Sequence, residues 1–206
     1  MLSKQPQEFL SRIDKEKSLK DVTVVFSTNG STMPSDTLIS LLKKCKKVSI
    51  AVSLDGTNAA FEYIRNPLSW PEVESNCVNM STLADNIAVG ITNNIGIQNI
   101  DELIQIHQWY SEISAKSKIR SIDYFYTVGT LSLHNASGRL LDVWRQKLSS
   151  WQGSLPVIDQ FIKFLGSCTG QKDDDIWLKH LQMIDQRRGL NWMQALPNLY
   201  ESYRRI

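Results

Sequence analysis

The chain has 206 residues, 42% of them hydrophobic and 21% charged, and its formal net charge is +2. This length suits one sizeable domain, or one domain with a tail, and the composition is that of an ordinary globular protein. The small charge gives no reason to expect nucleic acid as a partner, and no apolar run approaches the roughly 20 residues of a membrane span. The first residues lack the apolar core of a signal peptide, so the sequence predicts a cytoplasmic protein without a membrane partner.

Helical and strand patterns alternate over the first 130 residues. Apolar spacing predicts helices and β-branched runs predict strands, and two helix starts carry clear signals: Ser35 is a natural N-cap, and Pro71 follows Trp70 at a first-turn position. In chain order we expect a helix near 7–17, a strand over 22–30, a helix over 36–45, a strand over 48–56, a helix from 70 to about 83, a strand over 86–94, a helix over 99–114 and a strand over 121–129.

Four strands separated by helical crossovers predict an α/β fold. The near-continuous apolar character of the strands favours a parallel sheet covered by helices, in a partial (βα) barrel-like arrangement of about four strands. After residue 130 the alternation stops, and 131–206 is expected to be a helical C-terminal extension packed on the 1–130 core.

Polar residues stand where the four strands end. They include Thr28 and Asn29 after the first strand, Ser53 and Asp55 after the second, and Thr92 and Asn94 after the third. In parallel α/β architectures ligands bind at the carboxyl ends of strands, and such side chains can hydrogen-bond a ribose or another polyol. The alternative is that Asn, Asp, Ser and Gly simply favour turns, whatever the function.

Several segments resemble radical S-adenosylmethionine (radical SAM) enzymes, and more narrowly the twitch-domain radical SAM proteins. "FSTNG" is followed one unit later by "VSLDG" and then by "FEYIRNPLSWPEVESN"; "TLSLHN" and the tail "IDQRRGLNWMQALPNLYESY" continue the similarity. The resemblance covers nearly the whole chain and is most specific over 61–70 and 185–199. It implies a parent function in radical-initiated modification of an unknown substrate.

The family's C-x-x-x-C-x-x-C loop and its Gly-Gly-Glu-Pro motif are missing. The three cysteines, Cys45, Cys77 and Cys168, are far apart in sequence and are expected to be reduced structural thiols. The resemblance therefore implies the C-terminal half of a radical SAM protein, with residues 1–130 as a truncated core. The intact family uses S-adenosylmethionine and a [4Fe-4S] cluster, but no cofactor is expected in this chain.

The resemblance also implies roles for the residues at the strand ends. Ser53 and Asp55 fall where the family contacts the ribose, Thr92 and Asn94 near the adenosine, and Thr28 and Asn29 near the methionine end. The first strand would lie beside the family's missing second strand. It would then be an exposed sheet edge, covered by a second copy in a homodimer, by a missing N-terminal half or by the N-terminal helix.

Three functions remain open. The isolated chain is expected to be an inactive partial radical SAM domain; the alternatives are a non-catalytic binding or assembly module with a degenerate radical SAM fold, and a complete small α/β enzyme. Hydrolytic or zinc chemistry has little support, because His107, His134 and His180 are scattered.

Three further features have structural interpretations. Arg65 could bind a carboxylate or phosphate, but pairing with a nearby Asp or Glu is the simpler expectation. The acidic residues 173–175 suit the first turn of a helix, and a hard cation is the alternative. The tryptophans of the C-terminal region are expected in the core.

Overall fold

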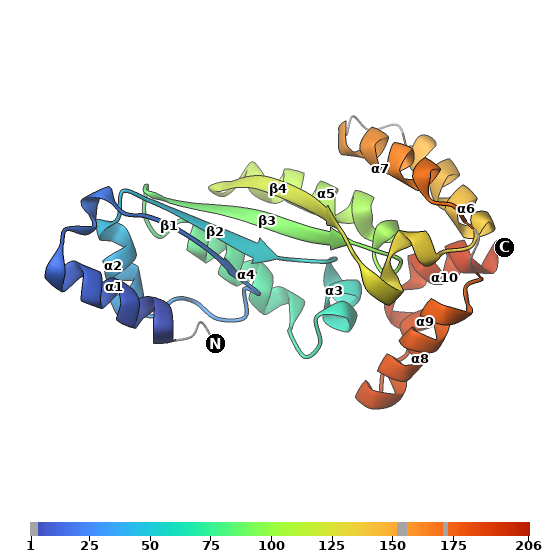
Figure 1. The fold of residues 1–206 in the computed structure, drawn as a ribbon, viewed down its shortest axis with the longest axis horizontal. Helices are drawn as coiled ribbons and strands as arrows, with labels where there is room; N and C mark the ends of the chain where they lie inside the picture. The colour runs from blue at the N-terminus through green and yellow to red at the C-terminus, as the bar shows by residue number, and fades with distance from the viewer. Residues whose placement is uncertain (1–3, 152–155, 171–172) are drawn as a thin grey trace. The chain divides into compact units, whose positions relative to one another are not determined.

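The structure, a computed structural model, describes residues 4–151, 156–170 and 173–206. Its described part is an α/β fold with a four-stranded parallel sheet in the order β1-β2-β3-β4 (Figure 1). The strands are β1 (Thr23–Thr28), β2 (Lys47–Ser53), β3 (Ile87–Ile95) and β4 (Ile119–Tyr126). The predicted α/β class, the parallel sheet of four strands and the helical C-terminal region are confirmed.

Each of the predicted helices has a counterpart in the structure. The elements are α1 (Lys4–Glu16), η1 (Leu19–Asp21), α2 (Asp36–Lys44), α3 (Asn58–Ile64), α4 (Trp70–Ser81), η2 (Ile100–Glu102), α5 (Leu103–Ser114), η3 (Gly129–Leu131), η4 (Leu133–Asn135), α6 (Gly138–Ser149), α7 (Pro156–Ser167), α8 (Asp175–Arg188), α9 (Trp192–Ala195) and α10 (Pro197–Arg204).

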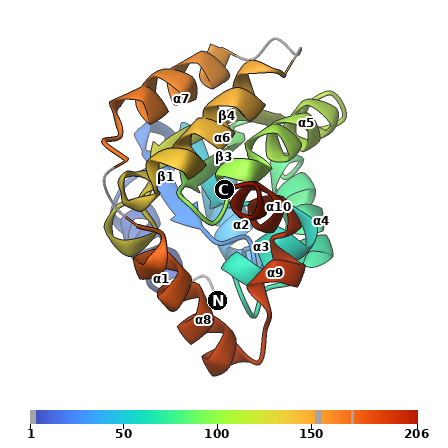
Figure 2. The ribbon, with the colours of Figure 1, turned by 90° about the vertical axis from the view of Figure 1, so that its right-hand side faces the viewer.

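The strands follow one another in space as they do in sequence. Thr23 lies opposite Lys47 in the β1–β2 pair, and Ser53 lies opposite Thr92 in the β2–β3 pair. β1 and β4 are consequently the two outer strands of the sheet, which Figure 2 views along the strand direction.

One face of the sheet carries the core. Val48, Ile50 and Val52 alternate along β2 and are all at most 1% exposed. They join a cluster that includes side chains from four helices: Leu42 of α2, Phe61 of α3, Val73, Cys77 and Met80 of α4, and Ile106 of α5. Because side chains alternate between the two faces of a strand, the residues between these buried ones lie on the opposite face of the sheet.

The opposite face carries small side chains. Ser49, Ala51 and Ser53 of β2 are partly exposed, as are Ala88, Gly90 and Thr92 of β3. A Cβ on Gly90 would come within 2.6 Å of the Ser121 Oγ, so a side chain at this position would require the Ser121 hydroxyl of β4 to move.

The chain divides by contacts into two compact units. The first comprises residues 1–93 and 105–124, and the second comprises residues 94–104 and 125–206. The second unit has its own core, in which Trp144, Phe161, Leu165 and Trp177 are at most 1% exposed. Of the tryptophans expected in the core, Trp144, Trp177 and Trp192 are buried, whereas Trp151 is half-buried. The predicted division near residue 130 stays a prediction, although residues 94–104 group with the C-terminal helices.

Among the residues with described positions, none of the helices combines the length and the apolarity that a membrane crossing would need.

Candidate functional site at the carboxyl ends of β2 and β3

The structure brings two of the predicted site residues together. Ser53 and Thr92 are register partners on β2 and β3, and their hydroxyl oxygens are 3.3 Å apart. Both belong to the face opposite the core, and both side chains are partly exposed. The pair offers two adjacent hydroxyls, each of which can donate and accept a hydrogen bond.

Asp55 lies two residues beyond β2 and is only 6% exposed. The preceding residue, Leu54, is fully buried and its N–H donates to the Thr92 carbonyl, which extends the β2–β3 ladder past Ser53. The Asp55 Oδ2 lies 2.6 Å from Arg65 Nη2. Arg65 thus pairs with an aspartate, which is the simpler of the two expectations for it.

The ion pair fixes the segment between β2 and α4. Arg65 is the C-cap of α3, and its Nε is buried without a hydrogen-bond partner within the described residues. The pair therefore holds the Asp55 carboxylate in one place, just after the end of β2.

Thr28 and Asn29 have local partners instead. The Thr28 Oγ1 accepts from the Gly30 N–H at 3.2 Å, and the Asn29 Oδ1 accepts from both the N–H and the hydroxyl of Ser31. Thr28 is the register partner of Val52, so it lies on the core face, opposite to Ser53. Both side chains thus stabilise a turn, and their predicted role in ligand binding stays a prediction.

Gly30 explains why this turn is so tight. Its φ is +73°, and a Cβ would lie 2.9 Å from a methyl carbon of Val73 and 3.0 Å from one of Val52. The Asn76 side chain of α4 donates to the Gly30 carbonyl at 2.8 Å. A residue with a side chain would be strained in conformation and would also collide with the core.

Asn94 belongs to the second compact unit. Its carbonyl accepts from the Asn99 side chain at 2.9 Å, and the Asn99 Oδ1 accepts from the Gly96 N–H. Its neighbour Asn93 is 1% exposed and lies in the first unit.

A shallow groove of about 580 Å³ with a mixed polar and apolar lining lies beside the turn after β1, and sequence reasoning missed it. The turn contributes Ser31 and Thr32, and the first turns of α4 contribute Ser75 and Asn76; Met33, Pro71 and Glu72 complete the lining. Its residues come from two segments about 40 positions apart in the sequence, and no motif in either segment predicts that the two lie side by side.

The cysteines do not fit an iron–sulfur cluster. Cys45 and Cys77 lie in the first compact unit and Cys168 in the second, and all three are free and buried. Burial raises the pKa of all three thiols, that of Cys77 to about 12, whereas cluster iron is bound by thiolates. Within the described residues, no group of three or more His, Cys, Asp or Glu side chains is arranged to hold a metal ion.

His107 is paired with a tyrosine in the first unit. Its Nδ1 lies 3.0 Å from the Tyr124 hydroxyl, and burial lowers the pKa of the imidazole. Burial also raises the pKa of the Tyr124 hydroxyl, so neither group is charged near neutral pH. The arrangement is a neutral hydrogen bond between α5 and β4.

Comparisons with protein-family models, with curated proteins and with solved structures found no match to this chain.

Proposed function

We propose that the carboxyl ends of β2 and β3 form a weak nucleoside-binding site in a partial radical SAM domain. In this proposal Asp55 accepts hydrogen bonds from ribose hydroxyls, and Ser53 and Thr92 contact the sugar or the base. The observation that carries it is the meeting of the Ser53 and Thr92 hydroxyls, 3.3 Å apart, at the end of β2, two residues before an Asp55 carboxylate that Arg65 holds at 2.6 Å. The resemblance of "VSLDG" to the ribose-binding segment of radical SAM proteins supports the same assignment.

The proposed role of the chain is binding rather than radical chemistry. In the intact family, a cluster-bound S-adenosylmethionine is the source of the radical, and the thiols of this chain do not fit that cluster. The residues of the chain itself would only bind and orient the nucleoside. The three free thiols suit a reducing compartment, so we place this function in the cytoplasm.

The proposal predicts weak binding. With the ribose contacts alone, we expect S-adenosylmethionine and adenosine to bind with a dissociation constant of about 1 mM, or roughly −4 kcal/mol. Titrating isotope-labelled protein by NMR should shift the amide signals of Ser53, Asp55 and Thr92. Adenine, which lacks the ribose, should shift them far less.

Two variants test whether adenosine binding depends on the Asp55 carboxylate. Asp55→Asn should weaken adenosine binding at least about fivefold, because a charge-assisted hydrogen bond becomes a neutral one. Asp85→Asn is the matched control, since Asp85 precedes β3 at the other end of the strands and its side chain is 98% exposed. Urea unfolding of both variants checks that they are folded. Equal shifts with adenine and adenosine, or unchanged binding by Asp55→Asn, would refute the ribose assignment.

A non-catalytic assembly module is the second candidate function, and one observation favours it. β1 is an outer strand of the sheet. An outer strand offers a row of backbone groups to another chain, whatever the carboxyl ends of the strands bind.

A further inference from the structure

The outer side of β1 has backbone groups without partners in the described part of the chain. The Lys46 N–H donates to the Val22 carbonyl, so the backbone groups of Val22 point toward β2. Because the direction of the backbone groups alternates along a strand, those of Val24, Phe26 and Thr28 also point toward β2. The N–H and C=O groups of Thr23, Val25 and Ser27 therefore point away from the sheet. No hydrogen bond from another described residue reaches them.

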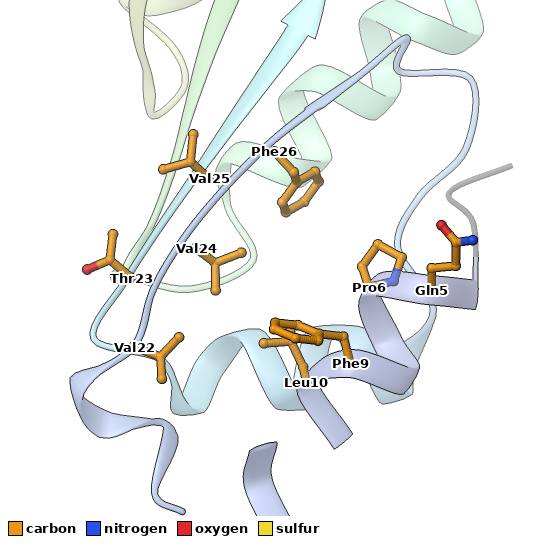
Figure 3. Close-up of a pocket in the computed structure, with 9 residues that line it drawn as sticks. All are labelled: Gln5, Pro6, Phe9, Leu10, Val22, Thr23, Val24, Val25 and Phe26. Carbon is orange, nitrogen blue, oxygen red and sulfur yellow. The ribbon is translucent and has the colours of Figure 1, made fainter. Parts of the chain in front are cut away.

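An apolar groove of about 560 Å³ runs along this strand (Figure 3). β1 forms one side of the groove through Val24 and Phe26, and α1 forms the other through Pro6, Phe9 and Leu10. Phe9 is 63% exposed and Val25, on the opposite face of the strand, is 72% exposed. The edge thus combines free backbone groups with apolar side chains on both of its faces.

The edge lacks the features that keep outer strands from pairing. Residues 22–28, "VTVVFST", contain no charged residue and no proline. Natural sheets protect such edges with lysine, proline, a bulge or a covering segment. An unprotected edge of this kind is a template for an extended strand.

We propose that a second copy of this chain occupies the edge, with the two β1 strands antiparallel about a two-fold axis that passes beside Val25. The three outward residues are spaced symmetrically about Val25, so the strand is complementary to itself. Val25 would exchange two hydrogen bonds with Val25 of the second copy. Thr23 would exchange two hydrogen bonds with Ser27 of the second copy, and Ser27 would exchange two with Thr23 of the second copy. The pairing would thus form about six backbone hydrogen bonds between the two copies.

The side chains match in this register. Val25 packs against its own copy on the open face, and Val24 faces Phe26 of the second copy on the groove side, where Phe9 lies. Apolar and β-branched pairs such as these stabilise antiparallel strands, and no like charges face each other across the pair. At the flank, Asp21 faces the uncharged Asn29 of the second copy. A parallel arrangement of two copies could not close by a two-fold axis, so the antiparallel register is the one that satisfies both edges at once.

Sedimentation velocity over a concentration series tests the proposal. The wild-type chain should change from a 23.5 kDa species to one of twice that mass as its concentration rises through the micromolar range. Val25→Lys and Val25→Glu should each weaken dimerisation at least about tenfold, because two like charges would face each other across the axis. Val25 is largely exposed, so neither change should unfold the chain, and circular dichroism checks this.

An equimolar mixture of the two variants is the decisive sample. The opposite charges then face each other, so the mixture should form a heterodimer at concentrations at which each variant alone is monomeric. Val128→Lys is the matched control, because Val128 is 87% exposed and lies outside β1, and it should leave the wild-type dimer intact. A strict monomer up to high concentration, a dimer insensitive to both Val25 variants, or a mixture that stays monomeric would overturn the proposal.

Discussion

Asp101 shows how a single buried carboxylate organises the second compact unit. Its side chain is 1% exposed, and it accepts hydrogen bonds from Trp144 Nε1 at 2.8 Å and from Ser202 Oγ at 2.9 Å. Lys147 Nζ also lies 2.5 Å from it. The carboxylate therefore joins η2 to α6 and α10, two helices that follow it by dozens of residues.

We expect Asp101→Asn to lower the free energy of unfolding by about 2–4 kcal/mol, because an amide cannot accept all three bonds and Lys147 loses its counter-charge. Urea unfolding measures the change. Asp85→Asn removes a carboxylate that also pairs with a lysine but is 98% exposed, and it should leave the unfolding midpoint unchanged. Equal effects of the two substitutions would mean that burial of Asp101 contributes nothing to stability.

The neighbouring residue, Glu102, gives a pH dependence of known sign. Burial raises the pKa of this carboxyl above 4.5, although the Asn198 side chain donates a hydrogen bond to it and partly opposes the shift. The folded state therefore holds the Glu102 proton more tightly than the unfolded state does. The stability contributed by this proton is present below pH 4.5 and is lost as the pH rises through the folded-state pKa.

We expect Glu102→Gln to remove this loss, because glutamine can accept the Asn198 hydrogen bond without carrying a charge. The variant should gain stability relative to wild type as the pH rises from about 4 to about 8, with the difference levelling off once the folded-state carboxyl has ionised. Urea unfolding across this range measures it. A difference that is constant with pH would show that the Glu102 pKa is the same in both states.

At the scale of single elements, local signals located most of the helices and strands. Ser35 caps α2 as predicted, with its hydroxyl accepting from the Leu38 N–H, and Pro71 lies in the first turn of α4. α3 was not predicted as a helix. It is only seven residues long, it begins at Asn58 with φ +49°, and its N-cap Thr57 makes no side-chain hydrogen bond, so it lacked the usual signals.

The C-terminal tail shows a different limit. Residues 131–206 were expected to be helical without internal boundaries, and near their end the structure has α9 and α10 separated at Leu196. Pro197 has no N–H and disfavours a helical conformation for the residue before it, and Leu196 accordingly adopts ψ +62°. Pro197 was sufficient to predict a helix break at this position, whereas the angle between α9 and α10 depends on packing.

Two glycines in neighbouring helices provide a matched pair. Gly189 ends α8 in the left-handed conformation with φ +65°, and Gly166 lies inside α7; a Cβ on either would meet nothing within 4 Å. Gly189→Ala should cost about 1 kcal/mol because its φ is unfavourable for a side chain, whereas Gly166→Ala should stabilise by up to about 1 kcal/mol through helix propensity. Thermal unfolding compares them, and shifts in the same direction would contradict the conformational explanation.

For the whole molecule, the fold class predicted from the sequence is confirmed, whereas the roles of the predicted site residues stay predictions. Strand order could be predicted because each strand is followed by a helical crossover. The polar residues at the strand ends were identified by position alone, and the side on which each one lies depends on alternation within the strand. That is why Ser53 and Thr92 meet while Thr28 lies on the core face. The Asp55–Arg65 pair and the groove beside the turn depend on how α3 and α4 pack, which local patterns do not encode.

The distribution of the thiols over the whole molecule gives the last prediction. Cys45, Cys77 and Cys168 are each at most 8% exposed. At a pKa of about 12 instead of 9.0, Cys77 carries about a thousandfold less thiolate near neutral pH than an ordinary cysteine. In the native protein we expect the three to react with a thiol reagent far more slowly than after unfolding, with Cys77 the slowest. Ser149→Cys, at an exposed position of α6, is the positive control and should react at once.

The same protein, incubated anaerobically with iron and sulfide, should bind no stoichiometric cluster, because forming one would require thiolates from the cores of two different compact units. The measurements are iron content per chain and visible absorbance, before and after replacing the three cysteines. About four irons per chain, lost in the Cys45→Ser or Cys168→Ser variant, would show that these thiols can leave the core and bind iron. Slow labelling together with absent iron would instead assign all three to packing.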